Sequence, residues 1–298
     1  MSFIPDPDPA SVFEIVEPKR RLIPLVFASP HSGRDYSREF ISLSSLDALS
    51  LRRSEDSFVD EIFEGAQACG APLLRALFPR AFVDPNREPF ELDPAMFEDD
   101  LPAFVNTSSP RVAAGLGTIA RVVGNGTEIY RSKLRYAEAL DRINACYKPY
   151  HAALRQLIDE THAQFGFCIL VDCHSMPTLG NKTEGANSVA NPAPRVDFVL
   201  GDCFGIACLP ALTDVVERTL TGFGYRTRRN NPYAGGFTTR HYGRPRKGVH
   251  ALQIEISRTL YMNEETIEPT PYLAVLKDQV TQLITALATF AGSNAMRR

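Results

Sequence analysis

The segment FGFCILVDCHSMP, residues 165–177, decides the fold of this chain. Its apolar first half is typical of a strand that is covered on both faces of a sheet. The strand runs directly into Asp172, Cys173 and His174 before Pro177 ends it. Open α/β sheets bind ligands outside the carboxyl ends of their strands, so these polar residues predict a functional site at that edge.

Strands and helices alternate on both sides of this segment. Apolar runs predict further strands in 22–33, 72–87, 196–202 and 248–257. Apolar residues at helical spacing predict helices over about 46–69, 127–164 with an interruption near Pro149, 211–222 and 271–291. The alternation predicts a single α/β domain over residues 1–298, with a mixed, mostly parallel central sheet and helices on both faces.

Composition narrows the classes of partner and compartment. The 32 basic and 35 acidic residues leave a formal charge of −3, so no overall field favours nucleic acid or an anionic membrane surface. No apolar stretch reaches the roughly 18 residues of a spanning helix, and the N-terminal segment lacks the pattern of a signal peptide. Six cysteines without a C-x-x-C pair indicate reduced thiols. We therefore expect a cytoplasmic protein.

Two of the six histidines, His31 and His174, directly follow predicted central strands. A catalytic zinc ion typically has three protein ligands and one open position, so these imidazoles predict part of a zinc site with a carboxylate as third ligand. Two structural histidines are the alternative. Strand alternation places Asp172 on the side of His174 and Cys173 on the opposite side, so Asp172 is expected to orient the imidazole.

The candidates for the third ligand lie in the segment RRSEDSFVDEIF, residues 52–63. We favour Asp56, because Asp60 and Phe63 continue one helical side from it. Glu55 is the competing carboxylate. A purely structural role at the start of a helix, where acidic side chains are common, is the alternative for Asp56.

Glu255 lies inside the apolar strand 248–257. A carboxylate in such a strand should be paired with a cation or have a raised pKa, and near a metal site it suits a general base. A buried ion pair with an arginine is the alternative. Alternation along the strand directs His250 to the opposite face, where we expect a structural role.

Two basic segments predict recognition of a small anionic substrate. Asn86 and Arg87 stand in the proline-rich VDPNREPFELDP, and Arg240 stands in NNPYAGGFTTRHYGRPR behind a Gly-Gly pair. The planar fork of a guanidinium matches a carboxylate, so two arginines over one sheet edge favour an acidic substrate. Exposed surface charge is the alternative for each arginine.

The segments that carry these residues resemble the N-formylglutamate amidohydrolase family over roughly residues 20–265. They are SPHSG (29–33), EDSFVDEIF (55–63), VDPNRE (83–88), VDCHSMP (171–177), NNPYAGGFTTRHYG (230–243) and GVHALQIEISRTLYM (248–262). This family is related in fold to the zinc carboxypeptidases and aspartoacylases, so the resemblance implies a zinc-carboxypeptidase-like fold with one zinc ion. It implies that His31, Asp56 and His174 bind the zinc and that Glu255 is the general base.

The resemblance also implies how the substrate is held. Asn86 and Arg87 look like the Asn-Arg pair that binds the substrate carboxylate in the carboxypeptidases, and Arg240 lies in a stretch typical of the formylglutamate enzymes. One departure is that the carboxypeptidases take their metal carboxylate three residues after the first histidine, where this chain has Arg34.

The activity that the resemblance implies is hydrolysis of N-formyl-L-glutamate to formate and L-glutamate, in histidine degradation. One alternative is a related zinc deacylase or carboxypeptidase-like hydrolase that acts on another N-acyl amino acid. The other is a binding protein that keeps the fold without chemistry. We expect a small acidic N-acyl amino acid as partner, with no nucleic acid and no membrane, and the sequence carries no indication of oligomeric state.

Overall fold

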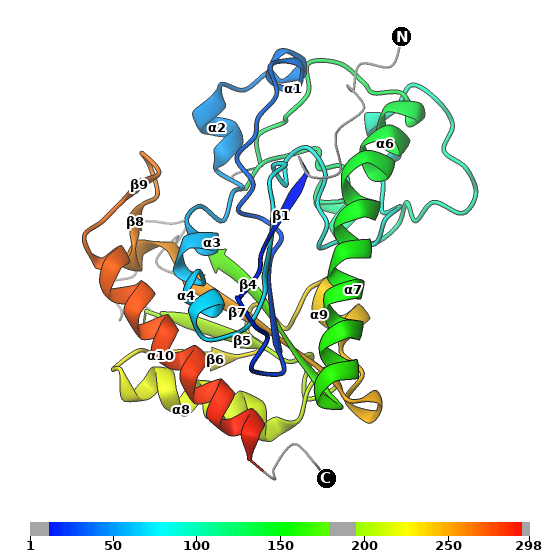
Figure 1. The fold of residues 1–298 in the computed structure, drawn as a ribbon. Coiled ribbons are helices and arrows are strands. Elements are labelled where there is room, and N and C mark those ends of the chain that lie inside the picture. The colour runs from blue at the N-terminus through cyan, green and yellow to red at the C-terminus, as the bar shows by residue number, and fades with distance from the viewer. Residues whose placement is uncertain (1–11, 125, 179–194, 294–298) are drawn as a thin grey trace.

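A computed structural model describes residues 12–124, 126–178 and 195–293 (Figure 1). Its centre is a sheet in the order β1-β3-β2-β4-β7-β5-β6. The strands are β1 Phe13–Val16, β2 Leu25–Ser29, β3 Leu73–Ala76, β4 Cys168–Met176, β5 Phe198–Gly201, β6 Thr227–Arg229 and β7 Val249–Ser257. A separate two-stranded sheet pairs β8 Met262–Asn263 with β9 Glu268–Pro269.

The sheet is mixed and mostly parallel, as predicted. β2 runs parallel to β3 and β4, β4 runs parallel to β7, and β5 runs parallel to β6. Only β1 against β3 and β5 against β7 are antiparallel pairs within this sheet. Ala28 pairs with Asp172, and His174 pairs with Glu255, so the loop after β2 and the ends of β4 and β7 meet at one edge.

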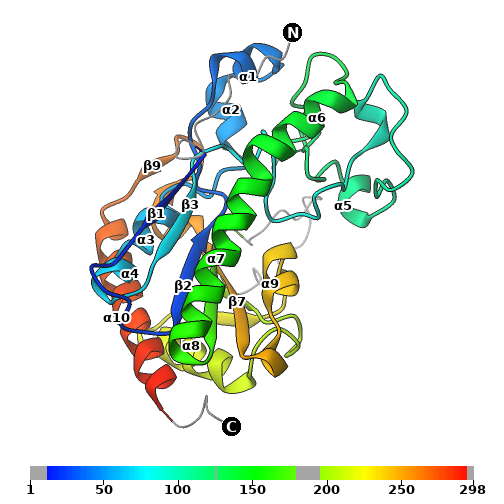
Figure 2. The same ribbon diagram turned by 45° about the vertical axis from the view of Figure 1, so that its right-hand side comes forward.

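Helices cover both faces of this sheet, which confirms the predicted α/β architecture (Figure 1, Figure 2). One face carries α7 and α9, and the other carries α3, α4, α8 and α10. The helices are α1 Arg38–Leu43, α2 Ala48–Arg52, α3 Val59–Ile62, α4 Gly65–Ala68, α5 Pro110–Ala113, α6 Tyr136–Arg142, α7 Lys148–Phe165, α8 Pro210–Gly222, α9 Phe237–Tyr242 and α10 Tyr272–Gly292.

Packing on the two faces fixes the register of β4. Ile169, Val171 and Cys173 belong to the core beneath α3, α4, α8 and α10. Cys168 and Leu170 belong to the core beneath α7. Burying one large aliphatic side chain stabilises the fold by about 1.5–3 kcal/mol, and a slip by one residue would exchange the two faces. The apolar alternation therefore holds the polar end of the strand at the sheet edge.

Most predicted elements are confirmed. β2, β5 and β7 lie in the predicted strand segments, and α8 and α10 agree with their predicted helices within one residue at each end. The segment 72–87 contains one short strand, β3, and the remainder is irregular.

The continuous helix predicted over 46–69 is wrong. This segment forms α2, α3 and α4, with turns between them. The backbone N–H of Asp56 donates to the carbonyl oxygen of His31 at 2.9 Å, and Phe58 adopts a left-handed φ of 67°. A tertiary hydrogen bond thus replaces the helical one and draws the chain towards the end of β2.

The helix predicted over 127–164 begins only at Tyr136, because the residues before it form isolated bridges such as Phe97 with Leu134. The predicted interruption is a π-helical turn, Ile143–Tyr147, between α6 and α7. Pro149 lies two residues after the end of this turn. Proline has no N–H to donate to the preceding turn, which accounts for the irregularity at that place.

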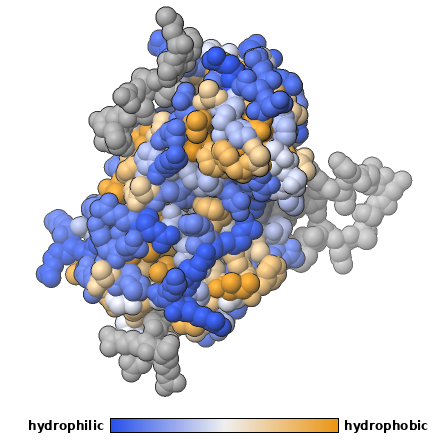
Figure 3. Space-filling view, turned by 90° about the vertical axis from the view of Figure 1, so that its right-hand side faces the viewer, coloured by the Kyte–Doolittle hydropathy of each residue, from blue (hydrophilic) through white to orange (hydrophobic). Residues whose placement is uncertain are grey.

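The surface mixes polar and apolar side chains. On the face drawn in Figure 3, hydrophilic side chains surround small, separate apolar patches. Among the helices that the structure describes, none combines the length and the apolar character needed to cross a bilayer. All six cysteines are free, and all but Cys69 are buried, as expected for reduced thiols.

Candidate active site

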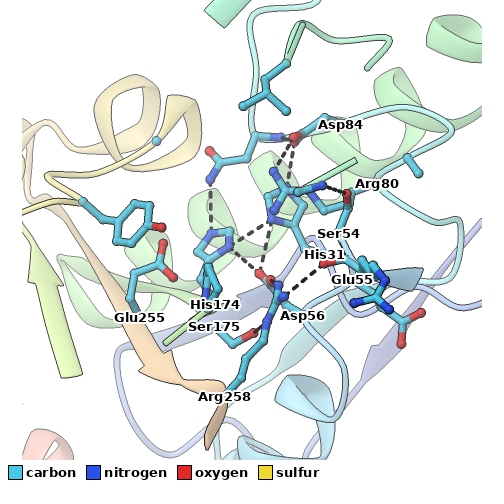
Figure 4. A pocket seen from close by; sticks show the side chains of 18 of the residues that line it. His31, Ser54, Glu55, Asp56, Arg80, Asp84, His174, Ser175, Glu255 and Arg258 are labelled. Carbon is cyan, nitrogen blue, oxygen red and sulfur yellow. Dashed lines mark hydrogen bonds and ion pairs between the residues drawn. The ribbon is translucent and has the colours of Figure 1, made fainter. Parts of the chain in front are cut away.

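A cavity of about 580 Å³ opens at the edge where β2, β4 and β7 end (Figure 4). Segments that are far apart in the sequence supply its walls, including the loop after β2, the turn after α2 and the segment after β3. Six of the seven predicted site residues line it, namely His31, Asp56, Asn86, Arg87, His174 and Glu255.

His31, Asp56 and His174 form a compact, buried group. The Nδ1 atoms of the two histidines lie 3.1 Å apart. Oδ2 of Asp56 lies 3.3 Å from Nδ1 of His31 and 3.1 Å from Nδ1 of His174. Three ligand atoms from three separate segments therefore face one another, as the sequence predicts for the metal site.

The outer nitrogen of each imidazole contacts another carboxylate. Nε2 of His31 lies 2.7 Å from Oδ1 of Asp84, and Nε2 of His174 lies 2.9 Å from Oδ1 of Asp172. Carboxylates accept hydrogen bonds, so in the neutral imidazoles each Nε2 carries the proton and each Nδ1 presents an unshared electron pair. The two unshared electron pairs and Oδ2 of Asp56 therefore face one another, and none of these three atoms has a hydrogen to donate. The arrangement fits a bound cation, and two nitrogens with one oxygen suit zinc.

The electrostatics of this group also favour a positive charge. Burial alone would raise the pKa of Asp56, but His174, His31 and Arg258 hold it well below its usual range. Burial alone would lower the pKa of His174, but Asp172 and Asp56 raise it well above its usual range. The group therefore attracts a positive charge strongly, either a proton on His174 or a metal ion in its place.

Glu55, the competing carboxylate, is buried but contacts other residues. Its two oxygens accept hydrogen bonds from Arg52, each at 3.0 Å, and one accepts a further bond from Ser57 at 2.7 Å. Asp56 is thus the acidic residue of this turn whose carboxylate faces the histidines.

Glu255 lies on the strand next to His174, and Figure 4 shows its carboxylate on the cavity side. Its Oε1 atom accepts a hydrogen bond from Gln253 at 2.7 Å, and Gln253 in turn accepts one from the backbone of Gly236 at 2.6 Å. Among the described residues no arginine forms an ion pair with Glu255. Burial raises the pKa of Glu255 to about 8, and positive charge on His174 opposes the shift.

Asn86 and Arg87 lie at the opposite wall of the cavity. Oδ1 of Asn86 accepts a hydrogen bond from the backbone of Thr238 at 2.8 Å, and its Nδ2 lies 3.1 Å from Nε2 of His174. The charged Asp172, being nearer, decides the tautomer of that imidazole. Arg87 uses Nε and one terminal nitrogen for backbone carbonyls. Its second terminal nitrogen forms an ion pair with Asp84 at 3.5 Å and has a further N–H for a ligand.

Arg240 is the one predicted site residue that does not line the cavity. It lies on α9 and is exposed. Its backbone carbonyl accepts a hydrogen bond from the side chain of Arg244. Its part in substrate binding remains a prediction.

Several residues of the cavity wall were not predicted from the sequence, among them Asp84, Arg80 and Arg258. Asp84 stands within the quoted VDPNRE segment and shares its carboxylate between His31 and Arg80. Arg258 directly follows β7 and donates to Oδ1 of Asp56 at 3.0 Å. A charged residue directly after a buried strand was the available signal for Arg258. Arg80 stands in an irregular segment without such a signal.

A sequence profile of the family described as N-formylglutamate amidohydrolase matches residues 23–262 of this chain. The chain belongs to the N-formylglutamate amidohydrolase family. The matched segment contains β2, β4 and β7 and all seven predicted site residues. The family resemblance carried by the six motifs is thereby confirmed.

Two relatives of the family match nearly the whole chain. N-formylglutamate deformylase of Pseudomonas aeruginosa is 26% identical over 277 residues, which cover 92% of this chain and 94% of the relative. N-formylglutamate deformylase of Pseudomonas putida is 28% identical over 265 residues, which cover 88% and 89%.

Solved structures extend this similarity to the fold. The crystal structure of N-formylglutamate amidohydrolase from Ralstonia eutropha JMP134 superposes with a TM-score of 0.86 at 38% identity, over 94% of this chain and 98% of that one. A gene product from Agrobacterium tumefaciens, at 19% identity, shares the fold with a TM-score of 0.63 over 95% and 97% of the two chains. The family fold thus extends over almost the entire chain.

Proposed function

We propose that this protein is a zinc-dependent amidohydrolase that converts N-formyl-L-glutamate and water to formate and L-glutamate. The observation that carries the proposal is the buried group of His31, Asp56 and His174 next to Glu255, in one cavity with unsatisfied arginine donors. Membership of the family and the names of the two Pseudomonas relatives support this choice of substrate.

His31, Asp56 and His174 would hold the zinc ion. When bound, zinc polarises the carbonyl group of the amide and lowers the pKa of water. Asp84 and Asp172 hold the two imidazoles in the orientation that the ion requires.

Glu255 acts as the general base. Its carboxylate accepts a proton from the water that adds to the formyl carbon, and it delivers that proton to the amide nitrogen as the carbon–nitrogen bond breaks. The hydrogen bond from Gln253 keeps the carboxylate in place. Burial raises its pKa to about 8, which suits a group that first accepts and then donates a proton.

Arginines provide the electrostatic part of the mechanism. Arg80 lines the cavity within electrostatic reach of Asp56 and Glu255, so its guanidinium can stabilise the negative charge that develops on the carbonyl oxygen. Asn86 and the remaining donor capacity of Arg87 bind a substrate carboxylate. Arg240 is proposed as a further contact at the rim.

The family resemblance adds two wider expectations. By the resemblance, the reaction would be the last step of a histidine-degradation route. The cytoplasm is the expected compartment, and the free state of all six cysteines supports this.

A hydrolysis assay on the zinc-loaded protein tests the proposal. We expect N-formyl-L-glutamate to be hydrolysed faster than N-acetyl-L-glutamate, N-formyl-L-aspartate and N-formyl-L-glutamine. Faster release of acetate from N-acetyl-L-glutamate would assign the site to another deacylase. A zinc-loaded protein that hydrolyses none of the four compounds would contradict the assignment as an enzyme for this class.

A further inference from the structure

Among the described residues, six arginines line the cavity, and they differ in whether their side chains form ion pairs. Arg52, Arg80, Arg87 and Arg258 each form an ion pair with an acidic residue of the cavity wall. The side chains of Arg53 and Arg111 form no hydrogen bond or ion pair with any residue in the described parts of the chain. An arginine that is half-buried without a partner retains its full set of donors for a ligand.

The backbone of Arg111 is linked through Leu116 to the side chain of Arg87. The carbonyl oxygen of Arg111 accepts a hydrogen bond from the N–H of Leu116 at 2.8 Å. The carbonyl oxygen of Leu116 accepts one from Nε of Arg87, also at 2.8 Å. Ser109 caps the helix α5 that carries Arg111. The side chain of Arg111 therefore has no hydrogen-bond partner among the described residues. Its backbone is linked through Leu116 to Arg87, a buried arginine of the proposed substrate site.

Charged groups of both signs surround the guanidinium of Arg111. Burial lowers the pKa of its guanidinium, and the positive charges of Arg240 and Arg80 add to the shift, while Asp84 and Glu91 oppose it. Asp84 is already shared with Arg80 and His31. A carboxylate that binds here would be attracted by Arg111, Arg80 and Arg240, and the engagement of Asp84 by its other partners offsets part of its repulsion.

We propose that Arg111 binds the side-chain carboxylate of the substrate and thereby selects glutamate. This inference rests on the proposed function and deepens it. Asn86 lies 3.1 Å from Nε2 of His174, so Asn86 and Arg87 adjoin the reacting centre and suit the α-carboxylate, which is attached next to the scissile bond. Arg111 lines the cavity, is linked to Arg87 through Leu116, and shows no contact with the metal-ligand group among the described residues, as the more distant carboxylate requires.

Two other arginines compete for this role. Arg53 precedes the Asp56 turn and lies close enough to the exposed Asp47 to lower the pKa of that carboxyl, so its charge acts on an acidic residue outside the cavity lining. Arg240 is exposed and lies outside the cavity lining. Arg111 alone among the three both lines the cavity and is linked to Arg87, through Leu116.

Steady-state kinetics on two nearly isosteric substrates test the assignment. The wild type, Arg111→Gln, Arg53→Gln and Arg240→Gln are compared on N-formyl-L-glutamate and N-formyl-L-glutamine, with Arg218→Gln, exposed on α8, as the matched control. Loss of a charge-assisted contact predicts that Arg111→Gln lowers kcat/KM for the glutamate substrate by about 10- to 100-fold, through KM. The glutamine substrate should be affected little. Arg111→Lys should restore part of the preference.

The pattern across the variants decides the outcome. An unchanged glutamate-to-glutamine ratio in Arg111→Gln overturns the proposal, and so does a change of that ratio in Arg53→Gln or Arg240→Gln instead. An equal loss on both substrates also overturns it, because Arg111 would then contact a group that the two substrates share.

A binding measurement separates this inference from the proposed function. Calorimetry with glutarate and with butyrate, on the zinc-loaded wild type and Arg111→Gln, requires no turnover. We expect the wild type to prefer glutarate and the variant to lose that preference. If no formyl amino acid is hydrolysed but the Arg111-dependent preference persists, the proposed reaction fails and the carboxylate site stands. If hydrolysis occurs and the variant binds glutarate like the wild type, the carboxylate site fails.

Discussion

Arg258 donates a hydrogen bond to Oδ1 of Asp56 at 3.0 Å, while Oδ2 of the same carboxylate faces His31 and His174. One oxygen of the Asp56 carboxylate thus binds Arg258, and the other is left for the metal site. Arg258 itself is held by Ser175 and by the backbone carbonyl of Arg53. Arg258, directly after β7, therefore orients Asp56, the proposed acidic ligand in the turn after α2.

Replacing Arg258 by Met should weaken zinc binding by about 10- to 100-fold, because Asp56 loses the partner that orients it. Competition with a chromophoric chelator measures the affinity. Arg218→Met, on the exposed side of α8, serves as control. A variant that melts like the wild type and binds zinc equally tightly would show that Arg258 does not position the ligand.

Replacing His31 or His174 by Ala should remove most of the bound zinc and the activity, because a catalytic zinc ion needs all three protein ligands. The fold should persist, since the apolar clusters on both faces of the sheet do not depend on the ion. Metal analysis and circular dichroism check both expectations, with His162→Ala as the control at the far end of α7. Full zinc content in both variants would contradict the assignment.

Glu255→Gln keeps the size of the side chain and removes the proton acceptor. Turnover of N-formyl-L-glutamate should fall by a factor of about 10² or more, while zinc content stays the same. Nearly normal turnover would identify Glu255 as a structural residue of β7.

Gln253→Met should change the pH dependence of the reaction. Gln253 donates to Oε1 of Glu255, and this bond favours the charged carboxylate. Without the bond the pKa of Glu255 rises, so the base forms only at higher pH and the acidic limb of the kcat/KM profile moves upwards. A pH profile that overlays that of the wild type would exclude this positioning role.

Gly236→Ala should raise KM, because a Cβ atom there would lie 2.3 Å from Nδ2 of Asn86. The amide of Asn86 is held by Thr238 and has little room to move. Gly222→Ala, where a Cβ atom meets nothing within 4 Å, is the matched control. Kinetics like those of the wild type would mean that Asn86 does not contact the substrate.

Local sequence patterns predicted much of the architecture and part of the site. The apolar run before Asp172 and the alternation through His174 depend only on the two-residue period of a strand, and both are confirmed in β4. The ends of parallel strands meet at one edge, so the proximity of His31 to His174 followed from the same pattern.

The sequence by itself determined the α/β class, the central strands and the edge at which the polar residues gather, because these follow from short-range apolar periodicity. Only the tertiary structure decided how the 46–69 segment breaks and that Asp56 faces the histidines, because the hydrogen bond from Asp56 to the His31 carbonyl joins residues with no local signal for each other. The same holds for the arginines. Exposed Arg240 and half-buried Arg111 carry the same charge in the sequence, and only long-range packing places Arg111 in the cavity wall beside Arg87.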